Sequence, residues 1–600
     1  MRLSILDFAV IAAYFAIIVA VASFFIGRAR RSMLDYFVSH RSTPWWLAGT
    51  AMVATTFSAD TPLAVTEMVA RNGVAGNWLW WSMLASGMMT VFFFARLWRR
   101  AEVVTDVELT ELRYGGRPAA ILRGFRAAYL GLVVNIIIMG WVNLGMAKVL
   151  SGTLGINKWA AIAGCLLITF VYTVLAGYWG IAASDGLQYC FEMGGAIVLA
   201  VISWRAVGGA PALLQKLGSA HPAGTPPGTL FGNAHDVLAF WPAGGGVWVM
   251  PAITLAALVG VNWWASWYPG AEPGGGGYVV QNISATRNED EGRAAALFFN
   301  VAHYAIRSWP WVITALCSLV IYGGAVRVAG VEDPGQNYVR MMVDLLPVGL
   351  RGFMLASFAA AYTSTMATQM NWGSSYLMND LYRRFIRRDA SERHYVAASR
   401  VAVAITLVLS IVVTIFMDQI SHAWEFLMML GAGTGLVYML RWYWWRINAW
   451  SEVSAMGAAL VTSLALRSQI DSGTPRGFAL NLIVTTAVTT IVWIAVTFAT
   501  RPESNETLVA FYRRARPADL GWRRLARETG IRGPNVELTR NALAWLLGVV
   551  MVYSIMFATG ALIFGERQKL VLFGGLLVVS ASGLWATLRP GRRGESSIDA

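Results

Sequence analysis

Long apolar segments dominate the sequence, and they constrain the fold more than any other feature. A helix that crosses a bilayer needs about 20 mostly apolar residues, and such segments follow one another along almost the whole chain. Charged residues make up only 13% of the 600 residues, about half the usual share in soluble proteins. A soluble fold of this length could not bury so much apolar surface. We therefore expect an all-α polytopic membrane protein.

The apolar segments number about fifteen when each is counted as one span. They lie near residues 5–26, 44–69, 77–97, 127–151, 158–178, 186–206, 247–281, 296–325, 350–380, 398–417, 423–443, 452–469, 478–500, 541–564 and 570–588. Two of them, 247–281 and 350–380, exceed the length of a simple span.

Arginines between the apolar segments account for the net charge of +14. Cytoplasmic loops of membrane proteins are rich in Lys and Arg, so this charge does not indicate a nucleic-acid partner. The basic loops lie near residues 28–41, 99–123, 383–393 and 513–527. Placing them in the cytoplasm puts the N-terminus outside and the C-terminus inside. We expect a multi-pass protein of the cytoplasmic (inner) membrane of a bacterium.

Residue patterns typical of enzymes and metal sites are missing from the sequence. The three cysteines all lie in apolar segments, which argues against a disulfide framework or a zinc site. The six histidines are scattered, without a metal-ligand spacing such as HExxH, and no GxSxG nucleophile motif is placed on a strand-to-helix turn. We therefore expect no enzyme activity.

A first helix break is predicted within residues 54–62. This stretch holds four hydroxyl residues, Asp60 and Pro62 inside one apolar segment. Proline removes a backbone donor and disfavours helix at the preceding residue, and a carboxylate inside a membrane is costly and usually functional. The alternative is a proline-kinked helix whose hydroxyls bond to their own backbone.

Two further segments carry the same kind of signal. Residues 262–277 contain two prolines and a run of glycines between apolar flanks, which indicates a broken membrane helix or, alternatively, a loop that ends a helix at Tyr268. Residues 359–371 place Ser364, Thr365 and Thr368 on about one helical face. Hydroxyls beside backbone carbonyls suit a hard cation, although small hydroxyl residues also pack helices together.

Arg307 stands several residues inside an apolar segment. One interpretation is structural: the side chain extends to the interface or pairs with Glu192 or Asp60. The other is a contact to substrate or to a gate.

Four segments of the sequence, 35–50, 105–115, 177–188 and 359–371, form an ordered set of motifs. Together they resemble the sodium:solute symporter family, which includes proline, sialic acid and sodium/glucose symporters, in both their order and their spacing. The resemblance extends over about residues 35 to 390, and the C-terminal third is supported mainly by hydropathy.

The resemblance implies a LeuT-like core of two inverted five-helix repeats with additional N- and C-terminal helices. The expected divisions are an N-terminal helix and basic loop (1–43), a first repeat (44–206), an extracellular loop (207–246), a second repeat (247–443) and accessory helices (444–600). The basic segment 501–540 of the last division is expected to face membrane lipid or simply to follow the positive-inside pattern.

The resemblance also assigns sodium ligands. The main Na⁺ site would use the carbonyls of Ala54, Phe57 and Ala361 and the hydroxyls of Ser364 and Thr365. A second Na⁺ site, present in some members, would use Asp185 and Thr368. This chain has Ala367 where the second site expects a hydroxyl.

The substrate pocket of the family draws on the first and sixth core helices. The matching positions here are Thr56, Ser58, Asp60, Thr61, Asn262, Trp263 and Trp264, and Arg307 stands where sugar-transporting members have a lysine. Glu272 lies in an apparent insertion, Gly270 to Gly276, from which it would reach the pocket or gate it.

These observations predict Na⁺-coupled uptake of a small organic solute by alternating access. Sodium would hold the broken first helix in a substrate-competent shape, and the repeats would then rock to expose both sites to the cytoplasm. The alternatives are a proton-coupled carrier, a channel or a transporter-like sensor without coupled transport. A single chain with paired broken helices fits a carrier better than a channel.

Overall fold

The computed structural model describes residues 2–29, 32–242, 250–328, 330–417, 420–471, 474–531 and 535–589. Parts of the predicted loops 207–246 and 501–540 therefore lie outside the described residues, as does the beginning of the predicted span 247–281. The described chain is helical apart from loops and one antiparallel hairpin of two short strands, β1 (Arg327–Val328) and β2 (Val331–Glu332).

The N-terminal part of the bundle runs to the first long loop. Its helices are α1 (Ile5–Ala29), α2 (Met33–Val38), α3 (Trp45–Phe57), α4 (Thr61–Asn72), α5 (Trp78–Trp81), α6 (Leu84–Met89), α7 (Ala95–Ala101), α8 (Leu109–Arg113), α9 (Gly116–Ala128), α10 (Asn135–Leu154), α11 (Lys158–Val207), α12 (Gly209–Leu217) and α13 (Ala234–Leu238).

The middle and C-terminal parts complete the bundle. The middle part comprises α14 (Ala252–Ala257), α15 (Trp263–Ala265), α16 (Gly277–Ala285), α17 (Glu289–Asn300), α18 (Ser308–Tyr322), α19 (Gln336–Leu345), α20 (Leu350–Ser375), α21 (Glu392–Ile415), α22 (Ile420–Leu430) and α23 (Gly435–Tyr443). The last part comprises α24 (Ala449–Arg467), α25 (Pro475–Ala499), α26 (Asn505–Ala515), α27 (Arg523–Thr529), α28 (Asn535–Phe564) and α29 (Arg567–Leu588).

Five π-helical segments and three 3₁₀ turns interrupt or join these helices. The π segments are η3 (Thr90–Phe94), η4 (Tyr129–Val134), η5 (Leu258–Asn262), η6 (Val301–Ile306) and η7 (Tyr376–Ile386). The 3₁₀ turns are η1 (Ser39–Arg41), η2 (Val74–Asn77) and η8 (Asp519–Gly521). A π turn is rare and often marks a functional site, and η5 and η6 directly precede Trp263 and Arg307.

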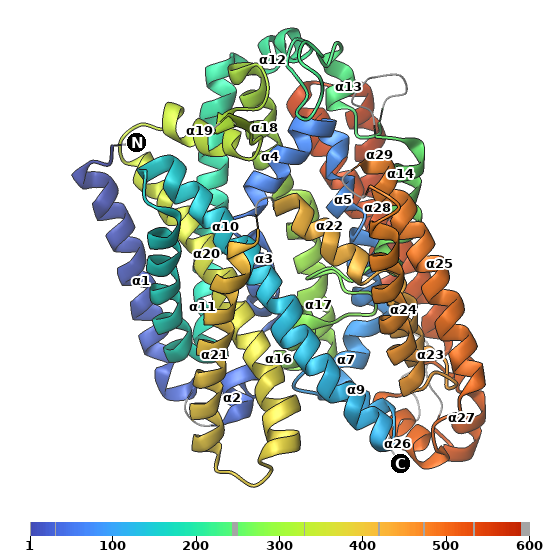
Figure 1. Cartoon of the computed structure of the whole chain (residues 1–600). Helices are drawn as coiled ribbons and strands as arrows, with labels where there is room; N and C mark the ends of the chain where they lie inside the picture. Colours follow the sequence, from blue (N-terminus) through green and yellow to red (C-terminus); the bar gives the residue numbers. More distant parts are fainter. Residues whose placement is uncertain are drawn as a thin grey trace.

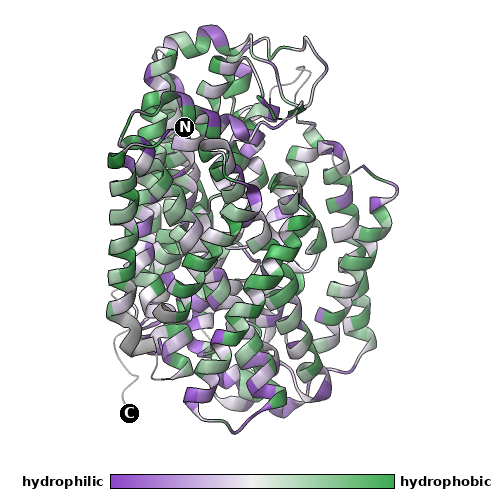
Figure 2. Ribbon diagram, turned by 60° about the vertical axis from the view of Figure 1, so that its left-hand side comes forward, coloured by the Kyte–Doolittle hydropathy of each residue, from purple (hydrophilic) through white to green (hydrophobic). Residues whose placement is uncertain are grey.

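Hydropathy and shape agree with a membrane protein. Hydrophobic residues follow the long helices, and hydrophilic residues gather at the two ends (Figure 2). Large apolar side chains on the outside remain uncovered, for example Val571 at 76% and Leu562 at 65% exposure. In Figure 1, α2, α26 and α27 lie at one end of the bundle and α12 and α13 at the other.

Nine helices of the described chain are long and apolar enough to cross a membrane, or ten if the bent pair α22–α23 forms one span. This is fewer than the fifteen segments counted in the sequence. The predicted span 44–69, for example, is divided into α3 and α4, and a 13-residue helix such as α3 is only about 20 Å long. Hydropathy counting joins such pieces, because it detects apolar composition and not the break.

Helix α11 packs most extensively against α20, and it also contacts α1, α3 and α18. Its 50 residues are not one straight helix, since Gly177 has φ 57° and ψ −175°. The bend divides α11 at the glycine-rich segment 177–188 singled out in the sequence. Helix α20 in turn packs against α1, α3, α10 and α21, so its hydroxyl face is enclosed by other helices.

Ion pairs, of which those of Glu452 are buried, connect helices near the end that carries α2 and α26. Glu452 on α24 bonds to Arg126 on α9 at 2.7 Å and to Arg441 on α23 at 3.1 Å, and its carboxylate is fully buried. Glu111 on α8 bonds to Arg384 on η7 at 2.8 Å. Both carboxylates thus connect segments that are far apart in the sequence.

Helix α28 forms hydrogen bonds with helices that occur much earlier in the sequence. The indole of Trp545 donates to the carbonyl of Ala85 (2.9 Å), and the Tyr553 hydroxyl donates to the carbonyl of Trp81 (2.8 Å). The Trp309 indole donates to the carbonyl of Met556 (2.8 Å). Helix α28 therefore connects α5–α6 with α18, segments that are far apart in the sequence.

Candidate functional site

The break between α3 and α4 creates a set of free carbonyl groups. Helix α3 ends at Phe57, because Ser58 has φ 30° and ψ 145° and turns the chain away. Pro62 lies in the first turn of α4, where its missing N–H costs nothing. The last four carbonyls of a helix have no intrahelical partner, and here they belong to residues 54–57. Both Ala54 and Phe57, predicted to contribute carbonyl ligands, are in this turn.

Hydroxyls of α20 meet these carbonyls. Ser364 Oγ lies 3.1 Å from the carbonyl oxygen of Ala54 and 3.5 Å from that of Ala361, and Thr365 Oγ1 lies 2.8 Å from the carbonyl oxygen of Thr55. Both hydroxyl side chains and the three residues that carry the carbonyls are buried. The structure therefore brings Ala54, Ala361, Ser364 and Thr365 together at the end of α3, and adds Thr55.

Glu192 also reaches this place, which the sequence reasoning did not foresee. Its Oε1 atom lies 3.2 Å from Ser364 Oγ, and its side chain is fully buried. From the sequence, Glu192 is expected only as a partner for Arg307. The sequence signal that could have identified Glu192 is a carboxylate inside an apolar segment, two helical turns after Asp185.

The predicted second sodium site is only partly assembled. Asp185 is fully buried, and neither of its carboxylate oxygens has a hydrogen-bond partner. Thr368, however, bonds to the hydroxyl of Thr55 at 3.1 Å. Among the hydrogen bonds of the described residues, none joins Asp185 to Thr368.

A narrow polar pocket lies directly beside the α3–α4 break. Its lining residues are Thr55, Thr56, Ser58, Asp60, Thr61, Trp80, Ile138, Trp141, Tyr268, Pro269, Tyr278, His303, Arg307, Thr365, Gln369 and Trp424. Thr56, Ser58, Asp60, Thr61 and Arg307 of the predicted pocket are thus together. Asp60 receives the hydroxyl of Ser58 on one oxygen, while Oδ2 has no partner. A ligand in this pocket would meet one free carboxylate oxygen and several aromatic rings.

Arg307 faces the pocket but is already engaged by protein groups. Its guanidinium lies 2.9 Å from Thr56 Oγ1 and 3.2 Å from the His303 ring, and it sits over the Trp311 ring at 5.2 Å. In the described part of the chain it forms no ion pair with Glu192 or Asp60, so the structural pairing considered from the sequence is not observed. Arg307 instead ties η6 to the end of α3.

The second break is present, but its tryptophans point elsewhere. Helix α15 ends at Ala265, and helical structure resumes at Gly277. Asn262 donates to Ser82 Oγ (3.3 Å), Trp263 packs against Trp545, and the Trp264 indole bonds to Gly260. None of the three is among the residues that line the pocket in this structure, whereas Tyr268 and Pro269 of the same segment do line it. A role for the three in binding solute stays a prediction.

Glu272 lies in the connection between α15 and α16, away from the pocket. It is 3% exposed, and neither carboxylate oxygen has a hydrogen-bond partner. The connection itself is held by Ser86, which donates to the carbonyl of Ala271, and by the Trp98 indole, which donates to that of Gly274. Glu272 therefore does not line the pocket in this structure, and a gating role stays a prediction.

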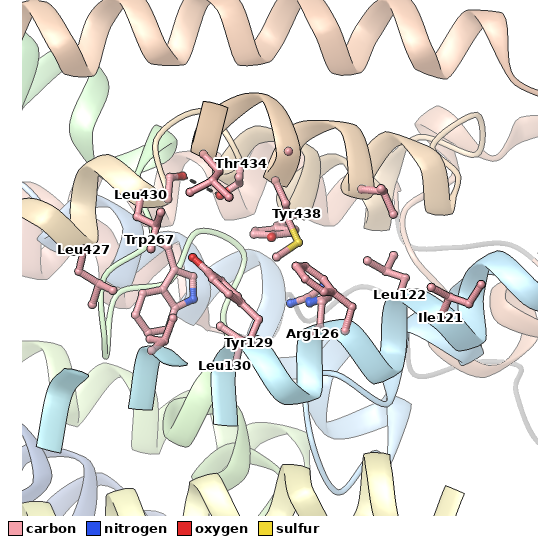
Figure 3. A pocket seen from close by; sticks show the side chains of 17 residues that line it. Ile121, Leu122, Arg126, Tyr129, Leu130, Trp267, Leu427, Leu430, Thr434 and Tyr438 are labelled. Carbon is pink, nitrogen blue, oxygen red and sulfur yellow. Dashed lines mark hydrogen bonds between the residues drawn. The ribbon is translucent and has the colours of Figure 1, made fainter. Parts of the chain in front are cut away.

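A wider crevice opens between α9–η4 and α22–α24, but its lining is mostly apolar (Figure 3). Leucines and aromatic rings such as Tyr129 and Trp267 form its walls, and Thr434 bonds to Gly431 of its own segment. Such a lining suits hydrocarbon better than a hydrated cation or a polar solute. The polar pocket at the α3–α4 break is the better candidate site.

Comparison with known proteins places this geometry in a family. Residues 36–458 match the sodium:solute symporter family, which is well over half of the chain. The chain belongs to the sodium:solute symporter family. The predicted resemblance is therefore confirmed, and the matched range extends further toward the C-terminus than the four motifs.

Relatives within the sodium:solute symporter family are distant in sequence. A sodium/glucose cotransporter of Vibrio parahaemolyticus is 22% identical over 490 residues, covering 78% of this chain and 86% of that protein. Sodium/glucose cotransporter 2 of Rattus norvegicus is 26% identical over 430 residues, covering 68% of this chain and 62% of that protein.

A solved structure shares the fold. A Na⁺-coupled sialic acid symporter in a substrate-bound outward-open state superposes with a TM-score of 0.64 at 19% identity, covering 84% of this chain and 99% of that chain. Family and fold together make the chain a sodium symporter of the membrane and not an enzyme, with Na⁺ as its coupling ion.

Proposed function

We propose that this symporter takes up a small organic solute by alternating access, driven by Na⁺ bound at the end of α3. The observation that carries the proposal is the meeting of free α3 carbonyls with the hydroxyls of Ser364 and Thr365. Carbonyl and hydroxyl oxygens are the ligands that hard cations prefer. Ala54, Phe57 and Ala361 would supply carbonyls, and Asp185 and Thr368 would belong to a second Na⁺ site.

Sodium and solute are coupled through one structural element in this proposal. The carbonyls lie at the last turn of α3, and the pocket begins at Ser58 and Asp60, the next residues of the chain. An ion that fixes the last turn of α3 therefore also fixes the pocket wall. A coupling free energy of this kind is reciprocal, so solute also strengthens Na⁺ binding.

The solute class follows from the pocket lining. Asp60 Oδ2 is a free acceptor, so it suits an amine or a hydroxyl of the solute, and Arg307 suits a carboxylate or hydroxyl. Trp141 and Trp424 offer faces for a ring. A sugar, an amino acid or an organic carboxylate fits this lining.

The membrane arrangement is proposed from the same residues. Two inverted five-helix repeats, 44–206 and 247–443, would rock around the site, with accessory helices at 1–43 and 444–600 and an outside loop at 207–246. The end with α2 and α26 would face the cytoplasm of a bacterium, with the N-terminus outside and the C-terminus inside.

A thermal-stability screen of the purified protein tests the proposal. A ligand that binds only the native state raises the unfolding midpoint, so a solute library is screened in Na⁺ and in K⁺. We expect some solutes to stabilise the wild type only in Na⁺. The double variant Ser364→Ala, Thr365→Ala should lose the Na⁺-dependent shift. Ser375→Ala is the control, because its hydroxyl bonds only within α20 to Trp372.

Two outcomes contradict the proposal. A wild type without any Na⁺-dependent shift would favour a proton-driven carrier, a channel or an uncoupled sensor. A double variant with the same Na⁺ response as Ser375→Ala would show that the ion binds elsewhere.

A further inference from the structure

Glu192 is directed toward the end of α3 by the close packing of α11 and α20. Ser357 on α20 donates to the carbonyl of Phe191 on α11 at 2.7 Å. A side chain added at Gly195 would overlap Ser357, so small residues let the two helices approach closely at this point. Glu192 is fully buried between them. Its position is therefore determined by the packing and not by a flexible side chain.

Around Ser364 Oγ, hydrogen-bond acceptors outnumber the hydrogen atoms that could be donated to them. Ser364 Oγ has three acceptors around it: Ala54 O at 3.1 Å, Glu192 Oε1 at 3.2 Å and Ala361 O at 3.5 Å. A serine hydroxyl carries one hydrogen atom, so it satisfies one of the three. Glu192 Oε2 has no hydrogen-bond partner at all. With Glu192 ionised, acceptors outnumber hydrogen atoms here, and a cation bound by these oxygen atoms would satisfy the surplus.

Nearby charges do not neutralise the carboxylate. The charged and titratable groups that act on Glu192 are Asp185, Arg307, Tyr14 and Tyr189. Asp185 repels a second negative charge, and the tyrosines are neutral hydroxyls. Arg307 is the cation among them, but it forms no ion pair with Glu192 and donates to Thr56 and His303. An isolated buried carboxylate is unfavourable unless a cation or donor accompanies it.

We propose that the Glu192 carboxylate is an anionic ligand of the Na⁺ site at the end of α3. One carboxylate with neutral carbonyl and hydroxyl oxygens balances one monovalent charge in a dry site. In the described residues no group of three or more His, Cys, Asp or Glu side chains is placed to hold a metal ion, which argues against a divalent ion here. This inference rests on the proposed function, because it adds a ligand to the proposed site.

The test measures Na⁺ binding without any solute. Purified protein is titrated with NaCl at constant ionic strength, with choline chloride as the balance, and the Na⁺ concentration that gives half of the thermal stabilisation is recorded. Glu192→Gln keeps the size of the side chain and removes its charge. We expect its half-saturating concentration to rise by ~10-fold or more, since disturbing even an outer-shell partner costs 10–100-fold in metal affinity.

The control is Glu425→Gln, another carboxylate of the helical bundle, which lines a separate cavity beside α24. It should leave the Na⁺ midpoint unchanged. If Glu192→Gln does not yield folded protein, Glu192→Asp and Glu192→Asn are compared, because they share one shape and differ in charge. A Na⁺ response retained in Asp and lost in Asn supports the inference.

The failure of this inference is distinct from the failure of the proposed function. An unchanged Na⁺ midpoint in Glu192→Gln, or equal responses of the Asp and Asn variants, would overturn the role of Glu192. If the double variant Ser364→Ala, Thr365→Ala still loses the Na⁺ response in that case, the proposed function stands. A wild type that does not respond to Na⁺ overturns both.

Discussion

Gly145 on α10 is the residue whose substitution should disturb the α3–α4 break most directly. A Cβ atom built there lies 2.7 Å from Asp60 Cα, 2.8 Å from Asp60 Cβ and 2.9 Å from Asp60 N. Carbon atoms in contact normally lie about 3.5–4.0 Å apart, so the methyl group of Gly145→Ala would intrude by roughly 0.8 Å. Two of the atoms belong to the backbone, which cannot rotate away.

The expected cost follows from this overlap. Forcing an extra methyl into a packed interior costs about 1–3 kcal/mol of folding free energy, and here the strain falls on Asp60. If the break shifts to relieve it, the population with an intact pocket falls by roughly 5–150-fold. We therefore expect Gly145→Ala to lower the unfolding midpoint and to reduce Na⁺-dependent solute uptake into proteoliposomes.

Gly164→Ala is the matched control for this experiment. Gly164 is also within a helix, α11, but a Cβ atom there meets nothing within 4 Å. Alanine is favoured over glycine in a helix by up to about 1 kcal/mol, so this variant should be as stable as the wild type or slightly more stable. If Gly145→Ala matches Gly164→Ala in both midpoint and uptake, close packing against Asp60 does not control the break.

Two ion-pair predictions concern the end of the bundle that carries α2 and α26. Glu452→Gln removes the charge that compensates two buried arginines, which should cost about 3–5 kcal/mol of folding free energy. Unfolding followed by tryptophan fluorescence should show this loss of stability. Glu528→Gln, at an exposed pair, should lose almost no stability. Burial raises the pKa of Glu111, but hydrogen bonds from Arg384 and Arg123 outweigh it and hold the pKa below its ordinary value of 4.5. The stabilisation is therefore present at neutral pH and lost as the pH falls below about 4.5. The difference in midpoint between wild type and Glu111→Gln should shrink over that range, and a constant difference would contradict the assignment.

Sequence patterns predicted the main break because its signals are local. Pro62, the hydroxyl residues and Asp60 lie within nine residues, and proline chemistry alone favours a new helix start there. The structure begins α4 at Thr61, one residue before Pro62. The hydroxyl face of α20 was predicted from an equally local signal, because residues at positions i, i+1 and i+4 lie on about one side of a helix.

Contacts between distant helices could not be obtained in this way. Glu192 and Ser364 are 172 residues apart, and their meeting depends on how closely α11 and α20 pack. Trp263 and Trp264 were assigned to the pocket only by their match to family positions, and they directly follow the π turn η5. Such a match gives the place of a residue along the chain and not the direction in which its side chain points.

Helix α28 has a consequence for the order in which the molecule is assembled. Chains are made from the N-terminus at about 5–20 residues per second, and the tryptophan and tyrosine that bond to the carbonyls of Ala85 and Trp81 are more than 450 positions later in the chain. At such rates, those carbonyls lack these hydrogen-bond donors for tens of seconds, until the last helices are inserted. The bundle can therefore be completed only at the end of translation, and the earlier helices need lipid, water or an insertion partner to cover this surface in the meantime.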